Sequence, residues 1–129
     1  MTQDPGPKPK IKILVADDHP SFRRAFKSLF HPDEAEVLEC SDGYEALIQY
    51  GEHRPHWVVM DYDMAPMDGL TATESIRKQF PEARILLITL HDGDDIREAV
   101  RKAGAVAFVR KENLMQARDI IRGTPAPQG

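Results

Sequence analysis

The sequence predicts an α/β fold in which helices cover both faces of a doubly wound, five-stranded parallel sheet. Short, continuous apolar runs such as Trp57–Met60 are typical of parallel strands, because neither face of such a strand meets water. These runs alternate with stretches in which apolar residues recur at helical spacing. The alternation repeats about five times, and right-handed crossovers then favour an open, doubly wound sheet.

Five apolar runs are the predicted strands. Ile85–Ile88 forms the centre of the strongest run, whereas the second run shows only partial alternation. The expected strands are Ile11–Ala16, Glu36–Cys40, Trp57–Met60, Arg84–Thr89 and Ala105–Val109.

One helix is expected after each strand, marked by apolar residues on one face. Pro20 and Ser21 signal the start of the first helix, Pro81 ends the third, and Gly104 ends the fourth. The marker residues are Phe22, Phe26, Leu29 and Phe30; Tyr44, Leu47, Ile48 and Gly51; Leu70, Thr73, Ile76 and Phe80; Ile96, Ala99, Val100 and Ala103; and Leu114, Ala117, Ile120 and Ile121.

The length of 129 residues suits one domain, and 41% hydrophobic residues suffice for a core. Residues 1–9 are rich in proline and predict a flexible or extended tail, and residues 124–129 have the composition of a linker or C-terminal tail. The folded domain is therefore expected over residues 10–123.

Charge and cysteine content exclude several classes of protein. With 17 basic and 21 acidic residues the net charge is −4. The chain therefore lacks the excess of positive charge that is typical of a general nucleic-acid binder. The basic stretch Arg23, Arg24 and Lys27 is interpreted as a solvated helix face or kinase-docking edge. Cys40 is the only cysteine, so an intramolecular disulfide is excluded. No apolar run reaches the ~18 residues of a membrane span, and no signal peptide is visible, so we expect a soluble, cytoplasmic protein.

Polar side chains follow the strands at the edge where ligands bind in open α/β sheets. Asp17 and Asp18 follow the first strand, Asp61 the third, Thr89 ends the fourth, and Lys111 comes shortly after the fifth. Carboxylates converging at one edge repel one another, by ~4 kcal/mol for two charges ~4 Å apart at an effective dielectric of ~20. Hard carboxylate oxygens suit Mg²⁺, which would relieve that repulsion.

Each of these residues also has a purely structural interpretation. Asp17 and Asp18 can cap the first helix, Asp61 can be a turn residue, Thr89 a β-former and Lys111 a solvated charge. Asp68-Gly69 is interpreted as turn chemistry and helix entry. Taken singly, the structural interpretations are favoured, but their convergence at one edge favours a functional site.

Four separated motifs resemble the receiver domain of two-component response regulators. They are Ile13-Leu-Val-Ala-Asp-Asp-His-Pro20, Val58-Val-Met-Asp-Tyr-Asp-Met-Ala-Pro-Met-Asp-Gly69, Leu87-Ile-Thr-Leu90 and Lys102-Ala-Gly-Ala-Val-Ala-Phe-Val-Arg-Lys111. The resemblance extends from about Ile11 to Gly123 and implies the flavodoxin-like (βα)5 architecture. The Ala-Asp-Asp-His-Pro variant is most similar to receivers that usually precede a C-terminal helix-turn-helix output domain.

The resemblance implies a role for each site residue. Asp61 is the expected phosphoacceptor for the phosphohistidine of a sensor histidine kinase. Asp18 and Asp61 are expected to bind Mg²⁺ through carboxylates, Asp17 through water and Asp63 through its backbone carbonyl. Thr89 and Lys111 are expected to contact the phosphoryl oxygens. The implied partners are the kinase and a downstream output domain or protein, with a homodimer possible and no direct nucleic-acid or membrane binding.

Three positions depart from common features of the family. Phe108 stands at the aromatic switch position but has no hydroxyl, so we expect a switch there to depend on packing, unless Phe108 is an ordinary core aromatic. His91 and Asp63 flank the site and are expected to influence the lifetime of the phosphorylated state. Glu112 follows Lys111 where many receivers have proline, so no cis peptide is expected there.

Two other functions remain as alternatives. Asp61-Tyr-Asp63 after an apolar strand also fits an aspartyl-phosphate phosphatase of the haloacid dehalogenase type, which is an enzyme. That family has the motif on its first strand, whereas here it follows the third. A pseudo-receiver regulated without phosphate is the second alternative. The combined presence of Asp18, Asp61, Thr89 and Lys111 disfavours it, and we expect a non-enzymatic signalling domain.

Overall fold

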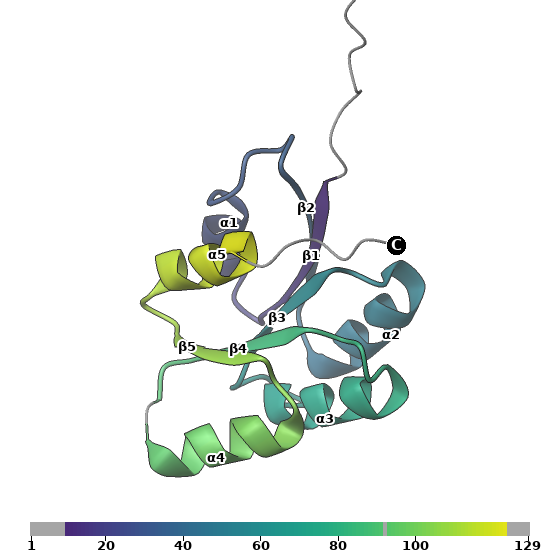
Figure 1. Cartoon of the computed structure of the whole chain (residues 1–129), viewed down its shortest axis with the longest axis vertical. Coiled ribbons are helices and arrows are strands. Elements are labelled where there is room, and N and C mark those ends of the chain that lie inside the picture. The colour runs from purple at the N-terminus through teal and green to yellow at the C-terminus, as the bar shows by residue number, and fades with distance from the viewer. Residues whose placement is uncertain (1–9, 92, 124–129) are drawn as a thin grey trace, which may run out of the picture.

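The computed structural model describes residues 10–91 and 93–123 (Figure 1), so the two predicted tails lie outside the described residues. The elements, in chain order, are β1 (Ile11–Ala16), α1 (Pro20–Lys27), β2 (Ala35–Cys40), α2 (Gly43–His53), β3 (Trp57–Asp61), α3 (Gly69–Gln79), β4 (Ile85–Thr89), α4 (Asp94–Ala103), β5 (Ala107–Arg110) and α5 (Leu114–Gly123). The predicted alternation of strands and helices is confirmed.

The five strands form one parallel sheet in the order β2-β1-β3-β4-β5. This is the flavodoxin-like order, in which the direction of winding reverses between β1 and β3. Figure 1 shows α1 and α5 together on one face of the sheet, while α2, α3 and α4 lie on the other. The carboxyl ends of β1 and β3 therefore meet at the switch point, where this class of sheet binds ligands.

Two apolar layers hold the helices to the sheet. Along β1, Ile13 and Val15 pack on the side of α1 and α5, whereas Leu14 and Ala16 pack on the side of α2, α3 and α4. All four side chains are fully buried, as the continuous apolar run predicts. Burial on both faces fixes the register of β1, and with it the position of the residues that follow Ala16.

Several expected positions differ in the structure. β2 begins at Ala35 rather than Glu36, β3 extends to Asp61, and β4 begins at Ile85 rather than Arg84. Helix α1 ends at Lys27, before its expected markers Leu29 and Phe30.

β5 begins at Ala107 rather than Ala105; Val106 is 56% exposed, although its N–H already donates to Ile85 O of β4 at 2.8 Å. Tyr44 and Ile48 mark helix α2 correctly, but they are 54% and 60% exposed, and the helix packs through Ala46 and Tyr50 instead. Helical spacing thus located α2 but did not identify its buried face.

The helix starts separate two structural interpretations of the acidic residues. His19 is the N-cap of α1 and makes no side-chain capping bond, so the N-cap interpretation of Asp17 and Asp18 is wrong. Asp68 does cap α3, since its carboxylate accepts a hydrogen bond from Thr71 N at 2.7 Å. The interpretation of Asp68-Gly69 as helix entry is confirmed.

Among the described residues the cis peptide bond is Ala65–Pro66, and Lys111–Glu112 is trans, as expected. Gly104 ends α4 with φ 93°, a left-handed conformation that glycine adopts without strain. None of the helices in the described part of the chain has the length and apolarity needed to cross a membrane.

Candidate phosphoacceptor site

Three strands bring two carboxylates and one ammonium group together. Asp17 directly follows β1, Asp61 is the last residue of β3, and Lys111 directly follows β5. The Lys111 Nζ atom lies 2.8 Å from Asp17 Oδ2 and 3.5 Å from Asp61 Oδ2. The convergence predicted from the strand ends is therefore observed for these three residues.

Both carboxylates are buried. The side chain of Asp17 is completely inaccessible, and Asp61 is only 2% exposed. One oxygen of each is held by the backbone two residues later: Asp17 Oδ1 accepts from His19 N at 2.8 Å, and Asp61 Oδ1 accepts from Asp63 N at 3.1 Å. These bonds turn the second oxygen of each carboxylate towards Lys111.

The ammonium group alone does not satisfy the pair. Asp17 Oδ2 is buried and forms an ion pair with Lys111 Nζ at 2.8 Å, but this contact lacks ideal hydrogen-bond angles, and no other group among the described residues donates to the oxygen. A buried carboxylate oxygen without a hydrogen bond is costly, and it is the kind of atom that a cation or an ordered water satisfies.

The pKa of Asp61 is raised to about 6, first by burial and then by the negative charge of Asp17, and the Asp63 N–H and Lys111 only partly oppose these two effects. For Lys111, burial by itself lowers the pKa, but the contacts with Asp17 and Asp61 outweigh it and the net shift is upward. Near neutral pH, Lys111 therefore stays charged beside carboxylates that repel each other.

The acidic residues fit a small, hard cation. Oxygen atoms of Asp17, Asp18 and Asp61 and a ring nitrogen of His19 all lie within 4.8 Å of one another. Asp18 is exposed and Asp17 and Asp61 are buried, so the cluster opens to solvent on one side only. Carboxylate oxygens with room for water are the ligands that Mg²⁺ prefers, and the buried, unsatisfied Asp17 Oδ2 agrees with a cation here.

His19 belongs to this cluster, although no role was predicted for it from the sequence. Its Nδ1 lies 2.9 Å from Asp18 Oδ1 and 3.2 Å from Asp17 Oδ1. The carboxylate of Asp63, by contrast, points elsewhere and lies 3.2 Å from His91 Nε2. This orientation leaves the predicted role of Asp63, which uses its backbone carbonyl, as a prediction.

Thr89 is fully buried at the end of β4, beside the end of β3. Its hydroxyl oxygen accepts a hydrogen bond from His91 N at 3.0 Å, and this bond uses a lone pair and leaves the O–H as a donor. His91 and Asp63 are paired across the two strand ends, a contact that was not predicted from the sequence.

Gly69 positions Asp61 in a way that the sequence did not reveal. A Cβ atom at Gly69 would lie 2.0 Å from the carbonyl oxygen of Asp61, a distance that no side chain tolerates. The Gly69 N–H also donates to Tyr62 O at 3.1 Å, which closes the loop between β3 and α3. A glycine directly after Asp68 could have suggested a close approach of the backbone here. It was instead interpreted only as part of a helix start.

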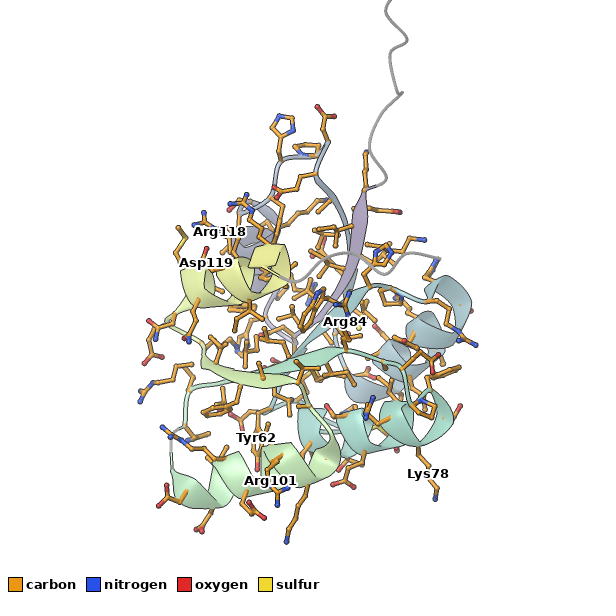
Figure 2. The ribbon with its side chains drawn as sticks, in the orientation of Figure 1. Tyr62, Lys78, Arg84, Arg101, Arg118 and Asp119 are labelled. Atoms are coloured by element: carbon orange, nitrogen blue, oxygen red, sulfur yellow. The ribbon has the colours of Figure 1, made fainter. Side chains whose placement is uncertain are left out.

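Phe108 is half-buried in β5, opposite Leu87 of β4, and packs at the edge of the apolar layer shared with α4. It also lines a shallow depression with Arg97, Asn113 and Gln116. Figure 2 shows Tyr62, the residue after Asp61, on the same side of the sheet as α4. Phe108 thus lies in the apolar layer on the α4 side of the sheet, and its role as a switch stays a prediction.

The family model of the response regulator receiver domain matches residues 13–122 of this chain. The chain belongs to the response regulator receiver family. It is 34% identical over 121 residues to the oxygen regulatory protein NreC of Staphylococcus haemolyticus, an alignment that covers 88% of this chain and 56% of NreC. The chain therefore spans about half the length of the curated relatives it matches.

Solved structures agree with this assignment. The crystal structure of a LuxR-family two-component response regulator from Aurantimonas sp. SI85-9A1 is 30% identical, with a TM-score of 0.78, and the match covers 92% of this chain and 91% of that one. The receiver domain of the histidine kinase CKI1 from Arabidopsis thaliana, solved in complex with Mg²⁺, is 29% identical with a TM-score of 0.73, covering 87% and 90%. The resemblance noted from the four motifs is confirmed.

As a receiver domain of a response regulator, the chain is a phosphoacceptor signalling module of two-component systems. The comparisons do not favour the phosphatase or the phosphate-independent alternative, since the relatives are signalling regulators.

Proposed function

We propose that Asp61 is the phosphoacceptor and receives its phosphoryl group from the phosphohistidine of a sensor histidine kinase. The observation that carries the proposal is a buried carboxylate at the end of the central strand, with Lys111 Nζ 3.5 Å away and the buried Asp17 beside it. A carboxylate oxygen of Asp61 forms a bond to phosphorus while the phosphorus–nitrogen bond of the kinase breaks, and its electron pair returns to the imidazole.

The surrounding residues supply positioning and charge neutralisation, which phosphoryl transfer needs more than covalent help. The bond from Asp63 N fixes Asp61 Oδ1, so that Oδ2 is the oxygen that faces Lys111 and is the one assigned to the attack. Asp18 and Asp61 would hold Mg²⁺ directly, Asp17 through water and Asp63 through its carbonyl. When bound, the cation would offset the negative charge that gathers on the phosphoryl oxygens.

Phosphorylation is proposed to bias a two-state equilibrium. The acyl phosphate adds negative charge and acceptor oxygens beside Thr89, whose O–H is available to donate, and beside Lys111. The segment after β4 would then shift towards the phosphoryl group, because a new contact exists in that state alone. The surface formed by α4, β5 and α5, with Phe108 at its inner edge, would carry the change outward.

The implied partners are a sensor kinase and an output domain or protein, with a homodimer as a further possibility. The proposal includes a cytoplasmic location and no catalytic turnover by the chain itself. The LuxR-family similarity and the partial coverage of NreC support a helix-turn-helix output domain as the recipient of the signal.

Intact-mass measurement tests the proposal. The chain is incubated with MgCl₂ and acetyl phosphate or phosphoramidate, and a single phosphoryl adduct is expected that is stable to mild acid and labile to base. Asp61→Asn should not label, whereas Asp119→Asn, an exposed carboxylate on α5 (Figure 2), should label like the parent. Undiminished labelling of Asp61→Asn would refute the assignment.

Two further arms of the same experiment test the metal and the enzyme alternative. EDTA should abolish labelling, and unchanged labelling would refute the role of Mg²⁺. A phosphatase would release many equivalents of inorganic phosphate from a phosphoester such as p-nitrophenyl phosphate. A receiver is expected to release none above background.

A further inference from the structure

The turn that carries Asp17 and Asp18 is held by a side chain of the following helix. Arg23, on α1, donates through Nη1 to the carbonyl oxygen of Asp17, and its backbone N–H donates to His19 O at 3.2 Å. The second bond is the ordinary backbone bond of the first turn of α1, so the bond to the Asp17 carbonyl is the contribution of the Arg23 side chain to this turn. No other side-chain donor to the Asp17 carbonyl is seen in the described part of the chain.

The guanidinium is itself fixed. Arg23 Nε lies 3.1 Å from Glu39 Oε1 on β2, and the side chain is only 17% exposed. The planar guanidinium presents several donors in a rigid fork, so one side chain can bond Asp17 and Glu39 at once. Arg23 therefore ties the turn to α1 and to the edge strand β2.

The remaining groups of Asp17 are held elsewhere. Its N–H donates to Cys40 O at 3.1 Å, and its Oδ1 accepts from His19 N. With the carbonyl held by Arg23, the peptide on each side of Asp17 is fixed, and this sets the direction in which Asp18 leaves the strand. Outer groups that orient a metal's ligands commonly change metal affinity by 10–100-fold when they are removed.

We propose that Arg23 is a positioning residue for the cation site, acting through the Asp17 carbonyl and not by touching the cation. This inference rests on the proposed function, because it assumes that Mg²⁺ binds at Asp18 and Asp61. Removing the guanidinium leaves the Asp17 carbonyl without its side-chain donor while the other bonds of Asp17 remain, so that the direction in which Asp18 leaves β1 is held less firmly. The affinity for Mg²⁺ then falls while the sheet remains intact.

Arg24 provides the matched control. It is the next residue on α1, is exposed, and carries the same charge, so Arg23→Gln and Arg24→Gln change the net charge equally. A general electrostatic effect would weaken cation binding in both variants or strengthen it in both. An effect of position would appear in Arg23→Gln alone.

The experiment is a titration of MgCl₂ into the full chain, followed by calorimetry and by amide NMR shifts of residues 17–19 and 61–63. We expect Kd for Mg²⁺ to rise about five- to tenfold in Arg23→Gln and by less in Arg23→Lys, which keeps the charge but lacks the fork. Arg24→Gln should stay within twofold of the parent. Thermal unfolding in EDTA reports separately on stability.

Each outcome has one meaning. If the parent does not bind Mg²⁺, the proposed function fails and the inference with it. If the parent and Arg23→Gln bind Mg²⁺ with equal affinity, Arg23 has only a structural role and the inference is overturned. This holds whether or not the unfolding temperature of Arg23→Gln in EDTA is lower than that of the parent. Arg23→Lys carries the test if Arg23→Gln does not fold: equal affinity of the folded lysine variant and the parent would also overturn the inference.

Discussion

Removing the charge of Asp61 should stabilise the metal-free protein. Asp61 is buried beside Asp17, and its pKa is raised from its usual value near 3.8 to about 6. A group whose pKa is raised by folding contributes its stability fully below the unfolded pKa, and loses it as pH rises through the folded pKa. Asp61→Asn keeps the shape of the side chain, and its amide oxygen can still accept from Asp63 N.

The size of the effect follows from the shift. A rise in pKa from 3.8 to about 6 corresponds to a destabilisation of roughly 3 kcal/mol at pH 7.5, where Asp61 is ionised. Each kcal/mol raises the unfolding temperature of a domain of this size by roughly 4 °C. Asp61→Asn should therefore unfold several degrees above the parent in EDTA at pH 7.5.

The pH dependence and the cation response check the cause. Between pH 7 and pH 4.5 the advantage of Asp61→Asn should shrink, because Asp61 of the parent becomes protonated. Excess MgCl₂ should stabilise the parent, since a ligand that binds the folded state stabilises it. The difference in unfolding temperature between Asp61→Asn and the parent should therefore become smaller in MgCl₂. The assay is thermal unfolding by circular dichroism in EDTA and in MgCl₂ across this pH range. A less stable Asp61→Asn at pH 7.5, or a gap that does not change with pH, would refute the reasoning.

Three further perturbations test the site and its readout. Gly69→Ala should lower the free energy of unfolding by about 1–3 kcal/mol in urea titrations and reduce labelling, because the new Cβ meets the Asp61 carbonyl; a neutral effect would contradict this contact. Lys111→Ala should still acquire some phosphate at Asp61 but should not transmit the conformational change to α4 and α5. Phosphorylation of this variant should therefore leave the NMR shifts of α4 and α5 nearly unchanged, and shifts like those of the parent would refute the role of Lys111. Phe108→Tyr should alter the ratio of partner binding or dimerisation with and without phosphodonor if residue 108 is a switch, whereas an unchanged ratio would make it a core residue.

The fold class and the meeting of three of the charged site residues follow from the pattern of residues along the chain. Continuous apolar runs can be buried on both faces only in a parallel sheet covered by helices, so Trp57–Met60 and its counterparts specified the architecture. The carboxyl ends of parallel strands share one edge. The positions of Asp17, Asp61 and Lys111 at the ends of their strands therefore predicted that the three residues meet. In the structure both carboxylates lie within 3.5 Å of Lys111 Nζ.

The groups that hold these side chains in place become apparent in the folded chain alone. Gly69 and Arg23 have ordinary local interpretations, as a helix entry and a solvated charge, and no spacing along the chain shows that one lies against the Asp61 carbonyl and the other bonds the Asp17 carbonyl. The sequence also did not show which face of α2 is exposed. Tyr44 and Ile48 have the helical spacing of core residues, but both side chains are exposed in the structure. Local pattern sets which elements form, whereas close approach between elements depends on three-dimensional packing.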